Sequence, residues 1–164
     1  MSKIVLNSSV IIALSTLGYI KKLKPLFNEI IVARAVYEEI CSAGQGLIGS
    51  LQLEEAMKNH LIEVKDAKNK LLVTALLDPL AIGEAETIAL AIDEHADGVV
   101  LDDKAARRKA KAMKLNVMGT LRVLRMMFDA KIIGKTEIIE ALTKLRETGF
   151  RVSDDLINKV KKEL

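Results

Sequence analysis

Polar side chains stand directly after two apolar runs of the sequence, and their residue types suit metal-assisted chemistry. Asp102 and Asp103 follow the run GVVL (98–101), and Asn7 ends the run KIVLN (3–7). In an open parallel sheet, ligands bind outside the carboxyl ends of the strands. If the two runs are neighbouring strands, these three side chains therefore meet in one crevice.

Further acids lie on the flanks of two helical segments. In the segment after residue 33, Glu39 falls at the edge of the buried stripe that Val36 and Ile40 define. In LAIGEAETIALAI (80–92), Glu84 and Glu86 lie about equally far from the centre of the buried face, on opposite sides. Spacing alone does not choose between them.

Such a cluster of carboxylates has a clear chemical use. Like charges a few ångströms apart raise one another's pKa, so the cluster is unfavourable without a cation. Oxygen ligands without thiols suit Mg²⁺ or Mn²⁺, which can activate water and stabilise a phosphodiester leaving oxygen. The acids therefore predict a Mg²⁺ or Mn²⁺ site.

The densest basic run follows the two aspartates and could steer phosphates towards them. Its candidate substrate contacts are Lys104, Arg107 and Arg108, although a solvated helix face is an equal interpretation. Ser8 and Thr120 each open a helical segment, where either side chain could contact substrate or simply cap the helix. Capping is also the ordinary interpretation of Asn7, Asp102 and Asp103 taken one at a time.

The elements that would position these residues alternate along the chain. Short apolar runs predict strands, and between them apolar residues at three- and four-residue spacing predict helices. This order is typical of right-handed βαβ units, so we expect a three-layer α/β/α fold on a parallel sheet of about five strands. The predicted strands are 3–7, 29–33, 61–64, 98–101 and 115–119, and the helices between them include 10–17, 35–43, 81–92 and 105–113.

Composition limits the class of protein. The 164 residues suit one domain, and only 3% are aromatic, so stacking of bases on aromatic platforms is not expected as a main binding mode. The net charge of +3 is far from that of a protein that coats nucleic acid. A single cysteine, no leader and no apolar run long enough for a membrane span predict a reducing, cytoplasmic setting.

The chain changes character near residue 135, where strands stop. Two helical segments follow, separated by ETGFRVSDD (147–155), in which Gly149 is a predicted helix stop and Ser153 a predicted cap. Residues 42–50, SAGQGLIGS, predict a flexible loop, because they lack the Lys-Ser/Thr ending of a phosphate-binding P-loop.

Several stretches together resemble the PIN domain family, in a branch close to the VapC-like toxins. They are IVLNSSVIIAL, VARAVYEEI, DPLAIGEAETIALA and VVLDDKAARRKAKAMKLNVMGTL followed by AKIIG, with TGFRVSDDLINKV similar to the C-terminal tail of that branch. The resemblance implies a metal-dependent ribonuclease, often a homodimer and often the toxin partner of an antitoxin protein. It also implies a PIN-like domain over residues 1–134, with residues 135–164 as a helical extension packed on it.

Carried over residue by residue, the acidic set of the family falls on Asn7, Glu39, Glu84 and Asp102, with Asp103 as neighbour or substitute. Position 7 departs from the pattern, because the family has Asp there. Asn keeps a carbonyl oxygen for a metal but removes a full negative charge, so metal affinity and nuclease rate should both fall. The alternative is a catalytically inactive PIN-like module that binds RNA or a protein.

Overall fold

The structure, a computed structural model, describes residues 3–163, and within them the chain forms a five-stranded parallel sheet. The strand order is β3-β2-β1-β4-β5, with Val5 of β1 level with Ile31 of β2 and Val99 of β4. The expected α/β/α fold on a parallel sheet of about five strands is confirmed. The strands are β1 (Lys3–Leu6), β2 (Glu29–Ala33), β3 (Glu63–Lys65), β4 (Gly98–Val100) and β5 (Val117–Met118).

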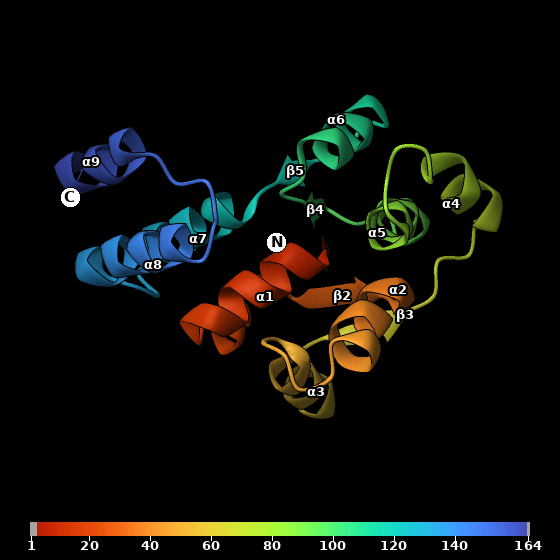
Figure 1. Ribbon diagram of the computed structural model, residues 1–164, viewed down its shortest axis with the longest axis horizontal. Coiled ribbons are helices and arrows are strands. Elements are labelled where there is room, and N and C mark those ends of the chain that lie inside the picture. The colour runs from red at the N-terminus through yellow and green to blue at the C-terminus, as the bar shows by residue number, and fades with distance from the viewer. Residues whose placement is uncertain (1–2, 164) are drawn as a thin grey trace.

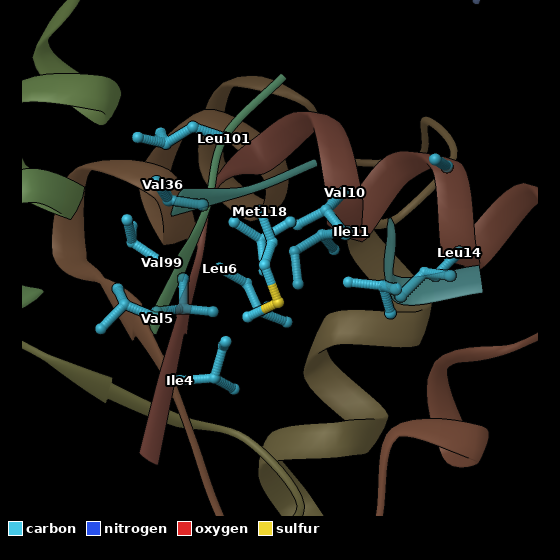
Figure 2. Close-up of a cluster of buried hydrophobic side chains, with 14 of the residues drawn as sticks. Ile4, Val5, Leu6, Val10, Ile11, Leu14, Val36, Val99, Leu101 and Met118 are labelled. Carbon is cyan, nitrogen blue, oxygen red and sulfur yellow. The ribbon is translucent and has the colours of Figure 1, made fainter. Parts of the chain in front are cut away.

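The core is built around the central strand β1. Figure 2 shows Ile4, Val5 and Leu6 of this strand within a cluster of buried side chains. Strands buried on both faces read as continuous apolar runs, which is why β1 and β2 are apolar after their first residues, Lys3 and Glu29, and why β4 is apolar throughout. The cluster also includes Val10, Ile11 and Leu14 of α1, Val36 of α2, Val99 of β4, Met118 of β5, and Leu101.

Helices cover both faces of the sheet, as Figure 1 shows. On one face, α5 (Ile82–Asp93) packs on β1, β2 and β4, with α4 (Lys70–Leu76) and α6 (Lys104–Ala112) beside it. On the other, α1 (Ser8–Leu17) packs with α7 (Thr120–Asp129) and α8 (Lys135–Glu147). The crossovers therefore leave the starts of α1, α5 and α6 near the carboxyl edge of the sheet.

The segment after β2 is more irregular than its sequence pattern predicts. Helix α2 (Arg34–Tyr37) continues directly into a π-helical segment, η2 (Glu38–Ala43), and after the turn at 44–49 the helix α3 (Ser50–Lys58) follows. A short 3₁₀ helix, η1 (Ile20–Leu23), links α1 to β2. The prediction for residues 42–50 was therefore right only for 44–49.

The C-terminal part is helical, as expected. Gly149 adopts φ +95° after α8, and Ser153 Oγ accepts a hydrogen bond from Leu156 N (3.1 Å) at the start of α9 (Asp154–Glu163). Both the helix stop and the cap are confirmed. The division at residues 134/135 stays a prediction, and its outer limits, residues 1 and 164, lie outside the described residues.

None of the helices within residues 3–163 combines the length and the apolar character that a membrane crossing requires.

Candidate functional site

A small pocket opens where the carboxyl end of β1 meets the starts of α1, α5 and α6. It measures about 270 Å³ and contains Asn7, Glu39, Glu84 and Asp103 in its wall. We call it the acidic pocket. Ser8 and Ser9 of α1, Ala81 and Gly83 complete the lining.

Asn7 continues the strand pairing of β1, because its N–H donates to the carbonyl of Val100 (3.2 Å). Asn7 stands at the N-cap position of α1, but its side chain makes no capping hydrogen bond. The capping interpretation of its side chain is therefore wrong. The residue is only 4% exposed, and Oδ1 lies 3.5 Å from the hydroxyl of Thr87, at the wall of the acidic pocket.

Glu84 and Glu86, which spacing could not separate, have different surroundings. Glu84 lines the acidic pocket, and its Oε1 accepts a hydrogen bond from Ala81 N (3.1 Å). Glu86 instead accepts a hydrogen bond from Ala35 N (3.0 Å) and so holds the start of α2. The geometry therefore favours Glu84 as the site residue.

The pKa of Glu84 reflects both its burial and its carboxylate neighbours. Partial burial from water raises the pKa of Glu84 above its ordinary value, and the carboxylates of Asp103 and Glu39 raise it further. The hydrogen bond from Ala81 N acts in the opposite direction. A cation placed among these groups would relieve the repulsion.

Glu39 belongs to the π-helical segment η2 and is exposed. Gly83 of α5 lies between Glu39 and Asn7. A Cβ atom on Gly83 would stand 3.8 Å from Asn7 Oδ1 and 3.9 Å from Glu39 Oε2. Single π-helical turns are frequent at functional sites, and here the turn carries Glu39 to the pocket wall.

Asp102 is locked in place by three hydrogen bonds and does not line the acidic pocket. Thr120 donates from its backbone N to Oδ1 (2.8 Å) and from its hydroxyl to Oδ2 (2.6 Å), and Ser9 Oγ donates to Oδ2 (2.7 Å). Thr120 therefore orients an aspartate instead of capping its own helix with its side chain. Asp102 ties the end of β4 to the starts of α1 and α7.

Asp103 has two roles. Its Oδ2 accepts a hydrogen bond from Ala106 N (2.9 Å), so it caps α6, and the same residue forms part of the acidic pocket. The capping interpretation is thus right for Asp103 but not for Asp102. Of the two aspartates, Asp103 is the one that faces Glu84. The family resemblance had assigned Asp102 to the acidic set and Asp103 only as its neighbour or substitute.

The basic residues after Asp103 do not act as one group. Arg107 reaches back to the strand end, where its Nη1 donates to the carbonyl of Leu101 (3.0 Å). Lys104 and Arg108 are exposed and line neither the acidic pocket nor the hollow beside Asp102. Their position suits long-range attraction of phosphates more than direct contact.

The donor types of the acidic pocket fit Mg²⁺ or Mn²⁺, because all are oxygen atoms of carboxylates or an amide. Within residues 3–163, however, no three acidic, histidine or cysteine side chains already converge on one point where a metal could bind. The pKa of Glu84 is raised first by burial and then by the neighbouring carboxylates of Asp103 and Glu39. A metal here would therefore require the exposed Glu39 and Asp103 carboxylates to turn inwards.

Sequence reasoning missed residues that shape the site without being acidic. Ser9 holds Asp102, and Thr87 contacts Asn7 Oδ1 from α5. Gly119 provides space, since a Cβ there would stand 2.7 Å from Arg107 Nη1. Only Ser9 carries a local sequence signal, because it follows Asn7 in the strand-to-helix turn.

Comparison with known proteins agrees with this fold. A family model described as a PIN domain matches residues 3–164. A PilT N-terminus domain protein from the hyperthermophilic archaeon Sulfolobus solfataricus P2 has a similar structure, with a TM-score of 0.54 and 19% sequence identity. The alignment covers 77% of this chain and 92% of that chain. No curated protein is significantly similar in sequence.

The family match spans nearly the whole chain, and it includes both C-terminal helices. The structural similarity, at 19% identity, shows the fold alone. The chain therefore belongs to the PIN domain family and has the nuclease-like fold of that family.

Proposed function

We propose that this protein is a metal-dependent endoribonuclease whose active site is the acidic pocket. The observation that carries the proposal is the meeting of Asn7, Glu39, Glu84 and Asp103 in one pocket of a PIN domain. Membership of the family supports a nuclease, and the crowding of Glu84 by Asp103 and Glu39 supports a cation site. The RNA substrate and the identity of the metal as Mg²⁺ or Mn²⁺ are parts of the proposal.

Glu39, Glu84 and Asp103, together with Asn7 Oδ1, would hold the metal. When bound, Mg²⁺ or Mn²⁺ would supply an activated water and would stabilise negative charge on the leaving oxygen. Asp102 positions the loop that carries Asp103, because its own oxygen atoms are engaged by Ser9 and Thr120. Asn7 contributes an oxygen without a charge, which weakens attraction for the cation.

The residues around the pocket would serve the substrate. Ser8 presents a hydroxyl at the pocket wall, within reach of a phosphate that enters it. Lys104 and Arg108 would attract RNA from solution, and Arg107 would stand at the strand end beside Asp102. Thr120 would act only through Asp102.

Cleavage of RNA in the presence of Mn²⁺ tests this proposal. Glu39→Ala should reduce the cleavage rate by at least about a hundredfold, the scale of removing one preorganised charged group from an active site. Glu38→Ala is the matched control, because Glu38 is the exposed neighbour that does not line the acidic pocket. Equal rates for the two variants would contradict the proposal.

A second candidate function is favoured by Asn7 itself. A neutral side chain at this buried position leaves the pocket one charge short of the family pattern, which suits an inactive module that binds RNA or a protein. Asn7→Asp separates the two functions. If the native chain binds RNA without cleaving it and Asn7→Asp cleaves, the pocket is a disabled active site.

The partners expected from the family resemblance are also proposals. They are a cognate antitoxin protein and a second copy of the chain in a homodimer, in a reducing, cytoplasmic setting. Size-exclusion chromatography with light scattering tests the dimer directly. Co-purification with the product of the adjacent reading frame tests the antitoxin.

A further inference from the structure

A second hollow lies on the other side of Asp103 from the acidic pocket. It measures about 540 Å³, within the range of small-molecule sites, and Asp103 belongs to the walls of both hollows. Three arginines line it, Arg107 of α6, Arg122 of α7 and Arg151 of the linker before α9. We call it the arginine pocket.

The arginines of this pocket differ from others in the chain. Arg34, Arg125 and Arg146 each form an ion pair with a nearby carboxylate. Within the part of the chain that the structure describes, Arg107, Arg122 and Arg151 have no such ion pair. Their guanidinium groups therefore keep donors available for an anion, since one guanidinium has five N–H groups and Arg107 commits one to Leu101.

Carboxylates also line the arginine pocket, but they are already engaged. Asp102 accepts hydrogen bonds from Ser9 and Thr120, and Asp103 accepts one from Ala106 N. The positive charges consequently outnumber the negative ones at this hollow, by three arginines to two aspartates. A group with one negative charge, such as a phosphodiester, fits that balance.

The linker between α8 and α9 supplies an aromatic ring to the same hollow. Phe150 lines the arginine pocket, and its N–H donates to the carbonyl of Leu145 (3.0 Å). Gly149 reverses the chain before it, and Val152 is buried after it. The backbone around Phe150 and Arg151 is thus fixed at both ends, which places the ring and the guanidinium together.

A neighbouring hollow extends the basic surface along the edge strand β5, from Asn116 to Gly119. It measures about 390 Å³ and shares Arg107, Gly119 and Arg122 with the arginine pocket. Gly119 is needed for this arrangement, because a Cβ there would meet Arg107 Nη1 at 2.7 Å. The three hollows are therefore adjacent, because the acidic pocket and the arginine pocket share Asp103, and the arginine pocket shares Arg107 and Arg122 with the hollow along β5.

We propose that the arginine pocket is a nucleotide subsite for single-stranded RNA, in which Arg122 and Arg151 bind a backbone phosphate and Phe150 stacks on a base. The proposal deepens the proposed function, since it gives the strand a place beside the acidic pocket. It also assigns a role to residues 149–151 of the C-terminal part. Phosphate recognition by guanidinium groups and base stacking on an aromatic ring are the two contacts that single-stranded nucleic acids use most.

Fluorescence anisotropy with a labelled six-nucleotide RNA, measured on the full chain in EDTA, tests the subsite without any cleavage. Arg122→Gln and Arg151→Gln should each weaken binding about fivefold to tenfold and lower the salt slope by about 0.7, the value for one lost contact with single-stranded phosphate. Lys144→Gln is the matched control, an exposed cation of α8 outside the pocket. Equal binding by all three variants would overturn the proposal.

The aromatic contact has its own test. Phe150→Leu keeps apolar packing but removes the ring, and it should weaken binding about tenfold, within the range measured for loss of one stacked base. Phe150→Tyr keeps an aromatic ring, so this variant should bind RNA like the native chain. If Phe150→Leu binds like the native chain while its thermal unfolding is unchanged, the stacking contact is overturned.

Competition separates a strand from a free nucleotide. A nucleoside monophosphate should displace the six-nucleotide RNA only at much higher concentration, and displacement at equal concentration would overturn the assignment to RNA. Cleavage with Mn²⁺ then separates this inference from the proposed function. If the native chain cleaves no RNA but the variants bind RNA more weakly than it does, the proposed function fails and the subsite stands. If the native chain cleaves RNA and the variants cleave it with an unchanged KM, the subsite is overturned.

Discussion

At the scale of single residues, the most informative position is Asn7. Its side chain neither caps α1 nor carries a charge, yet it is buried at the wall of the acidic pocket beside Thr87. A position that needed only a cap would use the side chain for capping. The side chain of Asn7 is therefore free of a capping role, which agrees with our proposal that it is a metal-ligand position without a charge.

Glu84 gives a prediction at the same scale. The folded state raises its pKa, so ionisation of Glu84 costs stability as the pH rises through that raised value, and the cost is absent below the ordinary glutamate pKa of about 4.3. Glu84→Gln keeps an oxygen for Ala81 N and removes the charge. This change should increase the free energy of unfolding at pH 7 by under about 1 kcal/mol and so raise the melting temperature. The gain is small because the group is partly exposed.

Thermal unfolding of the native chain and Glu84→Gln between pH 4 and pH 8 measures this effect, with the pH range set about the ordinary glutamate pKa. The difference in melting temperature between the two proteins should shrink towards zero at the acidic end of this pH range. A difference that stays constant with pH would show that the charge of Glu84 is not the cause.

Thr120 gives a prediction about the connection of elements. Its hydroxyl donates to Asp102 Oδ2, and the residue is fully buried. Thr120→Val should cost about 1.5–3 kcal/mol, because it removes a hydrogen bond to a charged group. Thr143→Val is the control, since Thr143 donates only to the carbonyl of Ile139 within α8. Urea denaturation of both variants measures the difference, and equal losses would contradict a special role for Asp102.

At the scale of elements, the sequence predicts the central strands well. The predicted runs 3–7, 29–33 and 98–101 match β1, β2 and β4 within about one residue at each end, because strands buried on both faces are apolar throughout. Predicted strand 61–64 lies at 63–65, and 115–119 shortens to 117–118, since these edge strands have fewer paired neighbours. The short helices α3 and α4 were not predicted.

The candidate site was only partly predictable, for a physical reason. Strand ends converge by topology, so Asn7 and Asp103 could be brought together from sequence. Spacing alone could not separate Glu84 from Glu86, and only the family resemblance favoured Glu84, because the physical difference is a contact of Glu86 with Ala35, 51 residues away in the sequence. Phe150 and Arg151 lie far along the chain, and nothing in their own sequence indicates which strand end they reach.

At the scale of the whole molecule, the C-terminal helices belong to the same hydrophobic core as the sheet. Helix α8 packs on α1 and α7 and buries Ile138, Leu142 and Leu145. Helix α9 packs on α8 and buries Ile157 and Val160. Residues 135–163 are thus continuous with the core that holds α1, whose first residues line the acidic pocket.

Truncation tests how far the fold depends on these helices. A chain ending at residue 134 should lose cooperative unfolding, because three fully buried apolar side chains contribute about 1.5–3 kcal/mol each and whole domains have only about 5–15 kcal/mol. A chain ending at residue 149 loses α9 and the linker 150–153 but keeps α8, and it should stay folded with a lower melting temperature. Circular dichroism on heating distinguishes the two. A cooperative transition in the 1–134 chain would show that the first 134 residues form an independent domain.

The central claim is that the carboxylates at the carboxyl edge of the sheet form one cation site. Calorimetric titration with Mn²⁺ tests it most directly, on the native chain, Glu39→Ala and the control Glu38→Ala. We expect saturable binding by the native chain and by Glu38→Ala, and loss of at least about tenfold in affinity in Glu39→Ala, the scale of about 1.4 kcal/mol. Identical titrations for all three proteins, or no saturable binding by the native chain, would contradict the account.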